Sequence, residues 1–275
     1  MADWRAYRVA YDGRPYHGFQ RQPTVPTVED EIFSALRELD VIDEDGPPLG
    51  YAAAGRTDAG VSAVAQTVGF NAPGWLSPAA MNSELPDSIR VWASAPTSSD
   101  FHATHDATER EYTYFMDGRA LAESRTRRAV EELSGQHDFH NLTPEDTGTR
   151  RTLEITLAIE WPFFVLTVCA GGFARQLVRR LVSLVREVGA GEAASGRIDT
   201  ILTDESLSGP AGVAPAPAYP LVLTDVAYPS LSFRTNSEAA SRALDRFEDL
   251  WIERSTSARV ARELVDGIDA GEPDN

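Results

Sequence analysis

The sequence contains no lysine, a single cysteine and no long apolar run. All 25 basic residues are arginines, and 42 acidic residues give a net charge of -17. One cysteine, Cys169, excludes an internal disulfide and a cysteine-based zinc cage. Its apolar neighbours in the sequence favour a buried structural thiol over a nucleophile. The most apolar stretch, residues 161–173, is too short to span a bilayer, and no signal-peptide pattern opens the chain. These absences predict a cytoplasmic protein.

The acidic excess is the most unusual bulk property of the chain. An acidic surface without lysine indicates adaptation to high salt, because carboxylates stay hydrated and salt screens their mutual repulsion. Taken alone, the same charge disfavours nucleic-acid binding, since proteins that bind nucleic acid usually carry a basic surface. Any argument for an RNA partner must therefore come from motifs.

The order of apolar patterns predicts an α+β fold, because strands dominate before helices alternate with them regularly. We expect two subdomains, residues 1–98 and 99–275, divided at the loop 96–100. Strands are expected at 4–11, 51–54, 61–70, 89–95, 111–116, 153–160, 163–170 and 221–228. Helices are expected from a capping box at 27–30 to Leu39, after the Ser77-Pro78 cap, and at 119–133, 172–188 and 237–263.

The turn Gly55–Gly60 is the most informative segment for chemistry. Two glycines bracket Arg56 and Asp58 between apolar strands, where a loop can present a carboxylate to a cleft. From these residues alone, a surface turn with an Arg–Asp pair is an equally good interpretation. A phosphate-binding loop is disfavoured, because the glycines are not followed by Lys-Ser or Lys-Thr.

Seven segments with distinctive composition follow one another along the chain. They resemble, in order, the motifs of the TruA family of tRNA pseudouridine synthases, from about residue 7 to residue 228. Two departures are Phe19, where tryptophan is usual, and Ser62, where histidine is common. The segments are YDGRPYHGFQRQ (11–22), GRTDAGV (55–61), MNSELP (81–86), FHA with REYTY (101–103 and 110–114), GQHDF (135–139), FARQLVRR (173–180) and APAYPLVL (216–223).

The resemblance implies that Asp58 is the catalytic carboxylate, which acts on a uridine so that the base detaches, rotates and reattaches through carbon. Arg179 matches the arginine that opposes the desolvation of this carboxylate. Tyr112 matches the tyrosine that stacks on the flipped base and moves a proton. Leu221 matches the apolar residue under that base. Without the resemblance, Tyr112 and Leu221 are more typical of core positions and Arg179 of a solvated helix charge.

The implied substrate is the anticodon arm of tRNA, at uridines 38, 39 and 40, which a homodimer would grip. The resemblance also implies a pseudouridine synthase fold of two subdomains, each with a mainly antiparallel sheet flanked by helices, and an active-site cleft between them. An isomerisation requires no cofactor and no metal. Arg175, Arg179 and Arg186 would share one face of the helix 172–188, offset from an apolar stripe. We therefore expect a basic cleft on an acidic body, with Arg56, Arg175 and Arg180 as further substrate contacts. The clustered arginines are Arg125, Arg127, Arg128, Arg150, Arg151, Arg175, Arg179, Arg180 and Arg186.

Two other classes stay open. His102 with His105, and His137 with His140, have a spacing seen in zinc sites, which would suit a metal-dependent hydrolase. The sequence lacks a His-Glu-x-x-His motif and a cysteine pair, so this signal is weak. The second alternative is a non-catalytic RNA-binding module. Such a module would have no need of Asp58 where phosphates approach.

Overall fold

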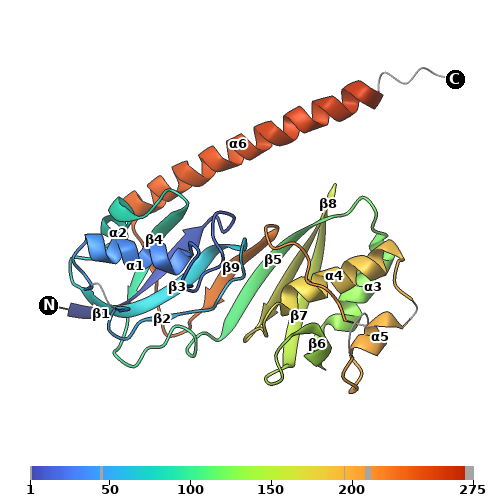
Figure 1. Ribbon diagram of the computed structural model, residues 1–275, viewed down its shortest axis with the longest axis horizontal. Helices are drawn as coiled ribbons and strands as arrows, with labels where there is room; N and C mark the ends of the chain where they lie inside the picture. The colour runs from blue at the N-terminus through green and yellow to red at the C-terminus, as the bar shows by residue number, and fades with distance from the viewer. Residues whose placement is uncertain (1, 44–45, 195, 208–211, 270–275) are drawn as a thin grey trace.

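A computed structural model describes residues 2–43, 46–194, 196–207 and 212–269, and a ten-stranded sheet forms its centre (Figure 1). The strands are β1 (Ala2–Tyr11), β2 (Ala52–Ala53), β3 (Ser62–Pro73), β4 (Ile89–Pro96), β5 (Glu109–Asp117), β6 (Gly135–Asp138), β7 (Arg150–Glu160), β8 (Phe163–Ala170), β9 (Leu221–Ala227) and β10 (Arg234–Thr235).

The strands lie in the order β10-β4-β1-β3-β9-β5-β8-β7-β6, with β2 paired to β3 at the side. The pairings are antiparallel except that of β3 with β9, which is parallel and joins Ser62 to Val222 and Ala63 to Leu223. On its other edge, β9 pairs antiparallel with β5. The late strand β9 therefore joins the two halves of the chain into one mixed, mostly antiparallel sheet.

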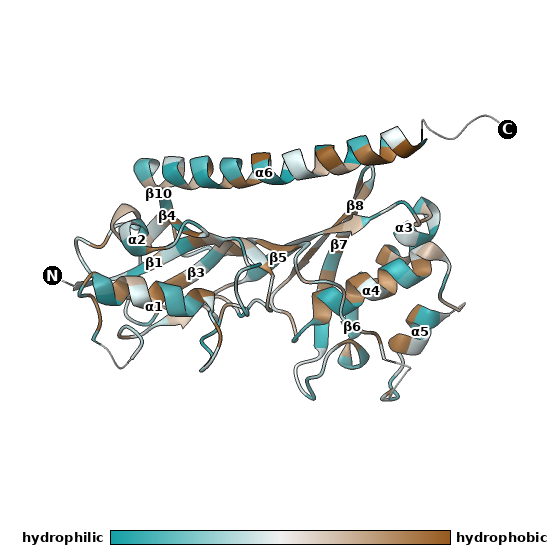
Figure 2. Ribbon diagram, turned by 45° about the horizontal axis from the view of Figure 1, so that its top comes forward, coloured by the Kyte–Doolittle hydropathy of each residue, from teal (hydrophilic) through white to brown (hydrophobic). Residues whose placement is uncertain are grey.

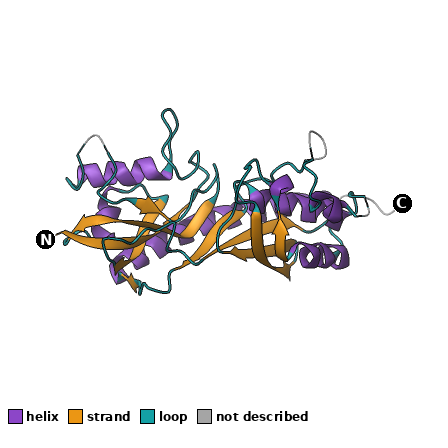
Figure 3. Ribbon diagram, turned by 90° about the horizontal axis from the view of Figure 1, so that it is seen from below, coloured by secondary structure: helices purple, strands orange, loops and turns teal. Residues whose placement is uncertain are grey.

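The helices are α1 (Val28–Glu38), α2 (Pro78–Glu84), α3 (Glu123–Leu133), α4 (Leu177–Ala190), α5 (Arg197–Ile201) and α6 (Ser237–Asp269), with a short 3-10 helix η1 (His140–Leu142). Figure 2 shows α1, α3, α4 and α5 on one face of the sheet and α6 along the other. Seen from below, the strands continue from one half of the molecule into the other (Figure 3).

The predicted α+β class is confirmed, but the expectation of separate sheets is wrong. A strand at 221–228 was expected, whereas its pairing with both β3 and β5 could not be deduced from its apolar pattern. The last segments also return to the first half of the chain, since β10 pairs with β4 and α6 packs against β4 and α2. The division at residues 98 and 99 stays a prediction.

Helix starts follow local chemistry. Thr27 caps α1 by accepting a hydrogen bond from the Asp30 amide, and Ser77 caps α2 in the same way through Ala80. The prediction that a helix begins at residue 172 is wrong. Gln176 has a left-handed backbone (φ +60°), so α4 begins only at Leu177. The helix expected at 119–133 likewise begins later, at Glu123.

The core lies between the sheet and the helices of one face. On α4, Leu177, Leu181 and Leu184 are buried, which confirms most of the predicted apolar stripe. This burial fixes the rotation of α4 and therefore the direction in which its arginines point. Among the described residues, no helix combines the length and the apolar character needed to cross a membrane.

Candidate active site

Asp58 lies in the loop between β2 and β3. The stretch of backbone that leads up to it, residues 53–57, forms the first limb of the loop, and hydrogen bonds fix it. Three consecutive backbone carbonyls of this limb each accept a bond from a side chain of another segment. These bonds give the irregular backbone the partners that a neighbouring strand would otherwise supply. The donors and acceptors are Thr104 Oγ1 to Ala53 O (2.6 Å), Arg110 Nε and Nη2 to Ala54 O (3.0 and 2.7 Å), and Gln66 Nε2 to Gly55 O (2.8 Å).

The segment beside Asp58 is bound on its other side by residues 11–19. Tyr11 and Thr57 share a buried hydroxyl–hydroxyl bond of 2.8 Å. The Phe19 amide donates to the Thr57 carbonyl (3.1 Å). Gly18 has φ +102°, and a Cβ there would lie 2.9 Å from that carbonyl, so only glycine permits this approach.

Ser62 fixes the stretch of backbone that follows Asp58, residues 59–62. Its hydroxyl accepts a hydrogen bond from the Gly13 amide (3.0 Å). A Cβ on Gly13 would overlap the Val61 carbonyl, so the two segments are in direct contact. A small hydroxyl side chain therefore supports the loop at the position where the TruA pattern has histidine.

The Asp58 carboxylate is paired with Arg179 of α4. Nη1 of Arg179 donates to Oδ2 of Asp58 at 2.8 Å, and the two side chains are 16% and 26% exposed. Opposite charges interact more strongly in such a partly enclosed site than on an open surface. The pair joins a loop of the first half of the chain to a helix of the second.

Arg179 is itself held in place by the segment before β9. Its Nε donates to the Ala216 carbonyl (2.7 Å), and the Ala216 amide donates to the Arg179 carbonyl (3.0 Å). A Cβ on Gly60 would lie 3.5 Å from the Ala218 Cβ, so the same segment also borders the Asp58 loop. Arg179 and the loop that carries Asp58 thus both border the chain leading into Leu221.

Tyr112 of β5 lies close enough to Asp58 for the two groups to interact electrostatically. Burial raises the pKa of the Tyr112 hydroxyl to about 12, with Arg110 lowering it and Asp58 raising it. The ring meets Phe173 edge-on, with centroids 5.3 Å apart and an interplanar angle of 84°. A neutral phenol beside a carboxylate can donate a hydrogen bond or a proton.

Comparison with known proteins agrees with this geometry. A family model described as tRNA pseudouridine synthase matches residues 129–229. A tRNA pseudouridine synthase A of Haloarcula marismortui is 55% identical over 96% of this chain and 100% of its own length. One of Halobacterium salinarum is 56% identical over 95% and 98%, and one of Methanosarcina mazei is 35% identical over 94% and 98%.

The chain belongs to the tRNA pseudouridine synthase A family. It is therefore an isomerase, and members of the family from halophilic archaea are 53–56% identical to it. Among solved structures, a chain of an archaeal Nop10–Cbf5 complex matches 67% of this chain and 44% of that one. Its identity is 15% and its TM-score 0.35, which is too low to add to the assignment.

Of the other arginines predicted to bind substrate, Arg56 and Arg175 are exposed. The prediction that Arg175 lies on the helix with Arg179 is wrong, because α4 begins after the left-handed Gln176. Arg180 is half-buried and donates to the Val213 carbonyl and to the Gln176 side chain (3.1 Å). In the synthase, Arg180 thus holds the loop before β9.

The predicted basic cleft is less basic than the sequence indicates. Several of its arginines are bound to carboxylates of this chain. Arg56, Arg175 and Arg186 are exposed and form no ion pair with any described residue. Together with Arg125, which is also exposed and forms no ion pair with any described residue, these arginines are left to attract phosphate. The paired ones are Arg127 with Glu123 (2.8 Å), Arg128 with Glu132 (2.8 Å), Arg150 with Asp138 (3.9 Å) and Arg179 with Asp58.

Leu221 is the first residue of β9 and is buried. It pairs across the sheet with Tyr114, and Tyr112 faces Leu223 instead. The Tyr114 hydroxyl donates to the Pro217 carbonyl (3.1 Å), which ties the approach to Leu221 to β5. The tyrosine and the leucine predicted to enclose the base therefore belong to neighbouring strands.

The histidine pairs form no metal centre with the described residues. The rings of His102 and His105 lie 4.1 Å apart, and Nδ1 of His102 accepts from the Thr104 amide. His137 contacts the Ser134 carbonyl, and His140 contacts Asp138. No described group of three or more His, Cys, Asp or Glu side chains could hold a metal ion. The family assignment sets aside the metal-dependent hydrolase.

Cys169 is half-buried, less enclosed than expected, with its Sγ 3.6 Å from a Glu111 carboxylate oxygen. Burial, followed by that carboxylate, raises the pKa of the thiol to about 12. A thiol this hard to ionise is a poor nucleophile.

Arg110 and Gln66 hold the Asp58 loop and were not predicted as site residues. Both are buried polar side chains in strands, in β5 and β3 respectively. Charged or amide residues at buried positions of a strand are rare unless they bind something. That signal could have identified them, but their backbone partners could not be read from sequence.

Proposed function

We propose that this synthase converts uridines 38, 39 and 40 of the tRNA anticodon arm to pseudouridine, with Asp58 as its catalytic carboxylate. The observation that carries the proposal is the 2.8 Å pair of Asp58 and Arg179, in a site built from both halves of the chain. We place the substrate cleft between these halves, which correspond to the subdomains 1–98 and 99–275.

The reaction rearranges one nucleoside without adding or removing atoms. The bond from C1′ of the ribose to N1 of the base breaks, and a bond from C1′ to C5 forms. The proton on C5 leaves, and N1 takes one up, so no oxidant or reductant is required. Asp58 supplies the negative charge that acts on the nucleoside, and the enclosure of the site limits competition from water.

Tyr112 and Leu221 are proposed to enclose the target base. A uridine within a stem must first leave its stack, which costs a few kcal/mol. Stacking of the base on the Tyr112 ring offsets part of this cost. Because the phenol stays neutral below its pKa of about 12, it can also return a proton to the ring.

Arg56, Arg175 and Arg186 are proposed to contact phosphates of the tRNA. They are exposed and unpaired among the described residues, whereas the protein as a whole is strongly acidic. Phosphate contacts weaken steeply as salt rises. Recognition in high salt should therefore depend more on tRNA shape and on 2′-hydroxyl contacts.

We also propose that the enzyme acts as a homodimer that uses the outer half of α6. Val260, Leu264 and Ile268 recur every four residues there and are 58%, 64% and 75% exposed. Figure 1 shows this half of α6 extending away from the body of the protein. An exposed apolar stripe of this kind is typical of an interface, and a second copy would cover it.

The test is pseudouridine formation in a tRNA transcript with uridine at 38, 39 and 40, in molar potassium chloride. Carbodiimide labelling followed by primer extension locates each product. The wild type should modify these positions, and a folded Asp58→Ala variant that still binds tRNA should modify none. Equal product from both proteins would remove Asp58 from the mechanism.

The same assay separates catalysis from binding alone. A non-catalytic RNA-binding module would bind the transcript and leave every uridine unchanged. Pseudouridine at other positions only would keep the reaction and overturn the choice of substrate sites. A gel-shift measurement in the same buffer supplies the binding data.

A further inference from the structure

Arg110 is a buried cation on the inner face of β5. It lies two residues before Tyr112, so both side chains leave the strand on the same side. It is 8% exposed, and no carboxylate of the described residues forms an ion pair with it. Burial of a cation without a counter-charge is strongly unfavourable unless its donors are satisfied. An apolar residue would fill this position at a lower cost in free energy, so packing alone does not explain the guanidinium.

The hydrogen bonds of Arg110 end on backbone carbonyls of three separate segments. Nε and Nη2 donate to Ala54 (3.0 and 2.7 Å), Nη2 also donates to Thr104 (2.7 Å), and Nη1 donates to Gly171 (2.8 Å). Thr104 in turn donates from its hydroxyl to Ala53. One planar group therefore joins three stretches of chain that are distant in sequence.

Two of these segments carry the ion pair. Ala54 lies in the first limb of the loop, which leads to Asp58. Gly171 begins the connection that leads from β8 to α4, and the chain then passes Phe173 and enters α4 with Arg179. Arg110 is thus a direct link between the loop of the carboxylate and the approach to the helix of its partner.

We infer that Arg110 is a positioning residue for the isomerisation, which sets the distance and angle between Asp58 and Arg179 without touching the substrate. This inference rests on the proposed role of Asp58. Lysine cannot replace it, because an ammonium group is a single point of charge and lacks the planar fork that reaches three carbonyls. A displacement of about 1 Å at the reacting groups is enough to lower a rate by about 10²-fold.

The experiment measures kcat and KM for tRNA in the wild type, Arg110→Lys, Arg179→Lys and the double variant. We expect Arg110→Lys to lower kcat by about 30-fold and to leave KM within about threefold, since the loss is in positioning rather than binding. If Arg110 acts through the ion pair, the double variant should be at most about threefold slower than the worse single variant.

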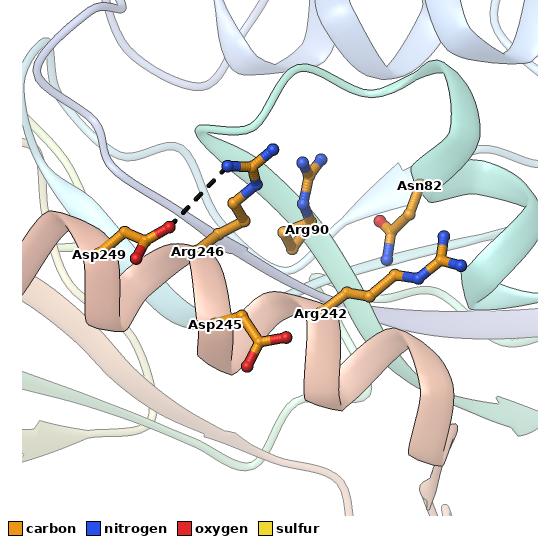
Figure 4. A pocket seen from close by; sticks show the side chains of 6 residues that line it. All are labelled: Asn82, Arg90, Arg242, Asp245, Arg246 and Asp249. Carbon is orange, nitrogen blue, oxygen red and sulfur yellow. Dashed lines mark ion pairs between the residues drawn. The ribbon is translucent and has the colours of Figure 1, made fainter.

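Arg90 offers a matched control. It is 6% exposed and also donates to backbone carbonyls, at Leu85, Pro86 and Ile89. These three carbonyls are near it in sequence, and Arg90, unlike Arg110, also forms an ion pair, with Asp87. It lines a cavity of about 330 Å³. Figure 4 shows it beside Asn82 and α6. Arg90→Lys should lower the melting temperature about as much as Arg110→Lys and keep kcat within about twofold.

The outcomes separate this inference from the proposed function. Turnover that depends on Asp58 but not on Arg110 overturns the inference alone. Independent effects that multiply in the double variant, or an equal loss of kcat in Arg90→Lys, also overturn it by showing a general structural role. Turnover that persists in Asp58→Ala overturns the proposed role of Asp58 and this inference together.

Discussion

The Asp58 loop and helix α6 are held in opposite ways. The loop has almost no regular secondary structure, yet consecutive carbonyls before Asp58 are bound by side chains of three other segments. Helix α6 is the longest regular element, with 33 residues, yet only Ala239 and Ala243 are buried. Regularity of the backbone and firmness of attachment are thus independent properties of this molecule.

The difference follows from what each segment positions. Catalysis requires a carboxylate held to within a fraction of an ångström, and side-chain bonds to a loop backbone supply that constraint. Helix α6 satisfies its own backbone hydrogen bonds, and pairs such as Arg262 with Asp266 (2.6 Å) lie along its surface. It can extend from the body without leaving polar backbone groups unpaired. Its apolar side chains, by contrast, stay exposed.

The largest effect should come from changing the Asp58 carboxylate. Asp58→Asn keeps the shape and removes the charge, so kcat should fall by at least about 10³-fold. Asp58→Glu keeps the charge and moves it by one methylene, and because the loop cannot shift to compensate, kcat should fall by about 10²-fold. Single-turnover kinetics on the tRNA transcript measure both. Near-normal activity of Asp58→Glu would show that the loop is mobile.

Arg179→Lys should have the next largest effect on activity. Lysine can reach Asp58 or the Ala216 carbonyl but cannot hold both, so we expect kcat to fall by about 10²-fold. The affinity for tRNA should change by less than about threefold. Kinetics paired with a gel shift in the same salt measure the split. A loss confined to KM would mean that Arg179 binds RNA instead.

The stability of the folded body around the site should fall at high pH, whereas that of helix α6 should not. The pKa values of Tyr7, Tyr112, Tyr114 and Tyr228 are each raised to about 12, chiefly by burial. The folded state holds these protons more tightly than the unfolded state, so stability is complete below pH 10 and falls as the pH rises towards 12. Tyr7, Tyr112 and Tyr228 each contribute at most about 3 kcal/mol, and Tyr114 contributes less because solvent screens its hydroxyl more.

Helix α6 contains no tyrosine, so its stability has no such dependence. Urea denaturation at pH 8 and pH 11, followed by tyrosine absorbance, measures the loss in the body of the protein. Unchanged stability at pH 11 would contradict the burial of these hydroxyls. Replacement of Tyr112 by Phe should remove part of the alkaline loss and provides the internal control.

Leu264→Glu should break the proposed dimer, because a charge within an apolar interface is strongly unfavourable. The mass measured by analytical ultracentrifugation should fall to that of one chain. Arg259→Gln changes the net charge by the same amount on the opposite side of the helix and should keep the dimer. A wild type that is monomeric at micromolar concentration would remove the proposal.

The smallest expected effect is that of Ser62→Ala. It removes the acceptor of the Gly13 amide, which should lower the free energy of unfolding by about 1 kcal/mol. Because the other bonds to the loop persist, kcat should change by less than about threefold. Thermal denaturation and kinetics on one preparation test this, and a tenfold loss of kcat would make Ser62 essential to the loop.

Local elements of the fold could be predicted from sequence because local signals encode them. The cap at Thr27, the apolar stripe of α4 and the strand that became β9 were all expected. The start of α4 was placed too early, because nothing in the residue type of Gln176 announces a left-handed backbone. The continuous sheet was missed because strand pairing is decided by tertiary packing rather than by periodicity.

The candidate site also has a part that could be predicted from sequence and a part that could not. Motif resemblance brought Asp58, Arg179 and Tyr112 to attention, and the structure places the first two in contact. The resemblance could not reveal that Arg180 binds a loop carbonyl or that Arg110 links two loops. Such roles depend on backbone atoms of distant segments, and backbone atoms carry no residue-specific pattern in the sequence.

The position of β9 near the end of the chain has a consequence for synthesis on the ribosome. The segments that carry Asp58, Tyr112 and Arg179 emerge early, but the strand that joins β3 to β5 emerges only with residues 221–227. A nascent chain that ends before β9 contains each reactive side chain but lacks the strand that joins the two parts of the sheet on which they lie. Activity should therefore appear abruptly, in the last fifth of translation, rather than accumulate with length.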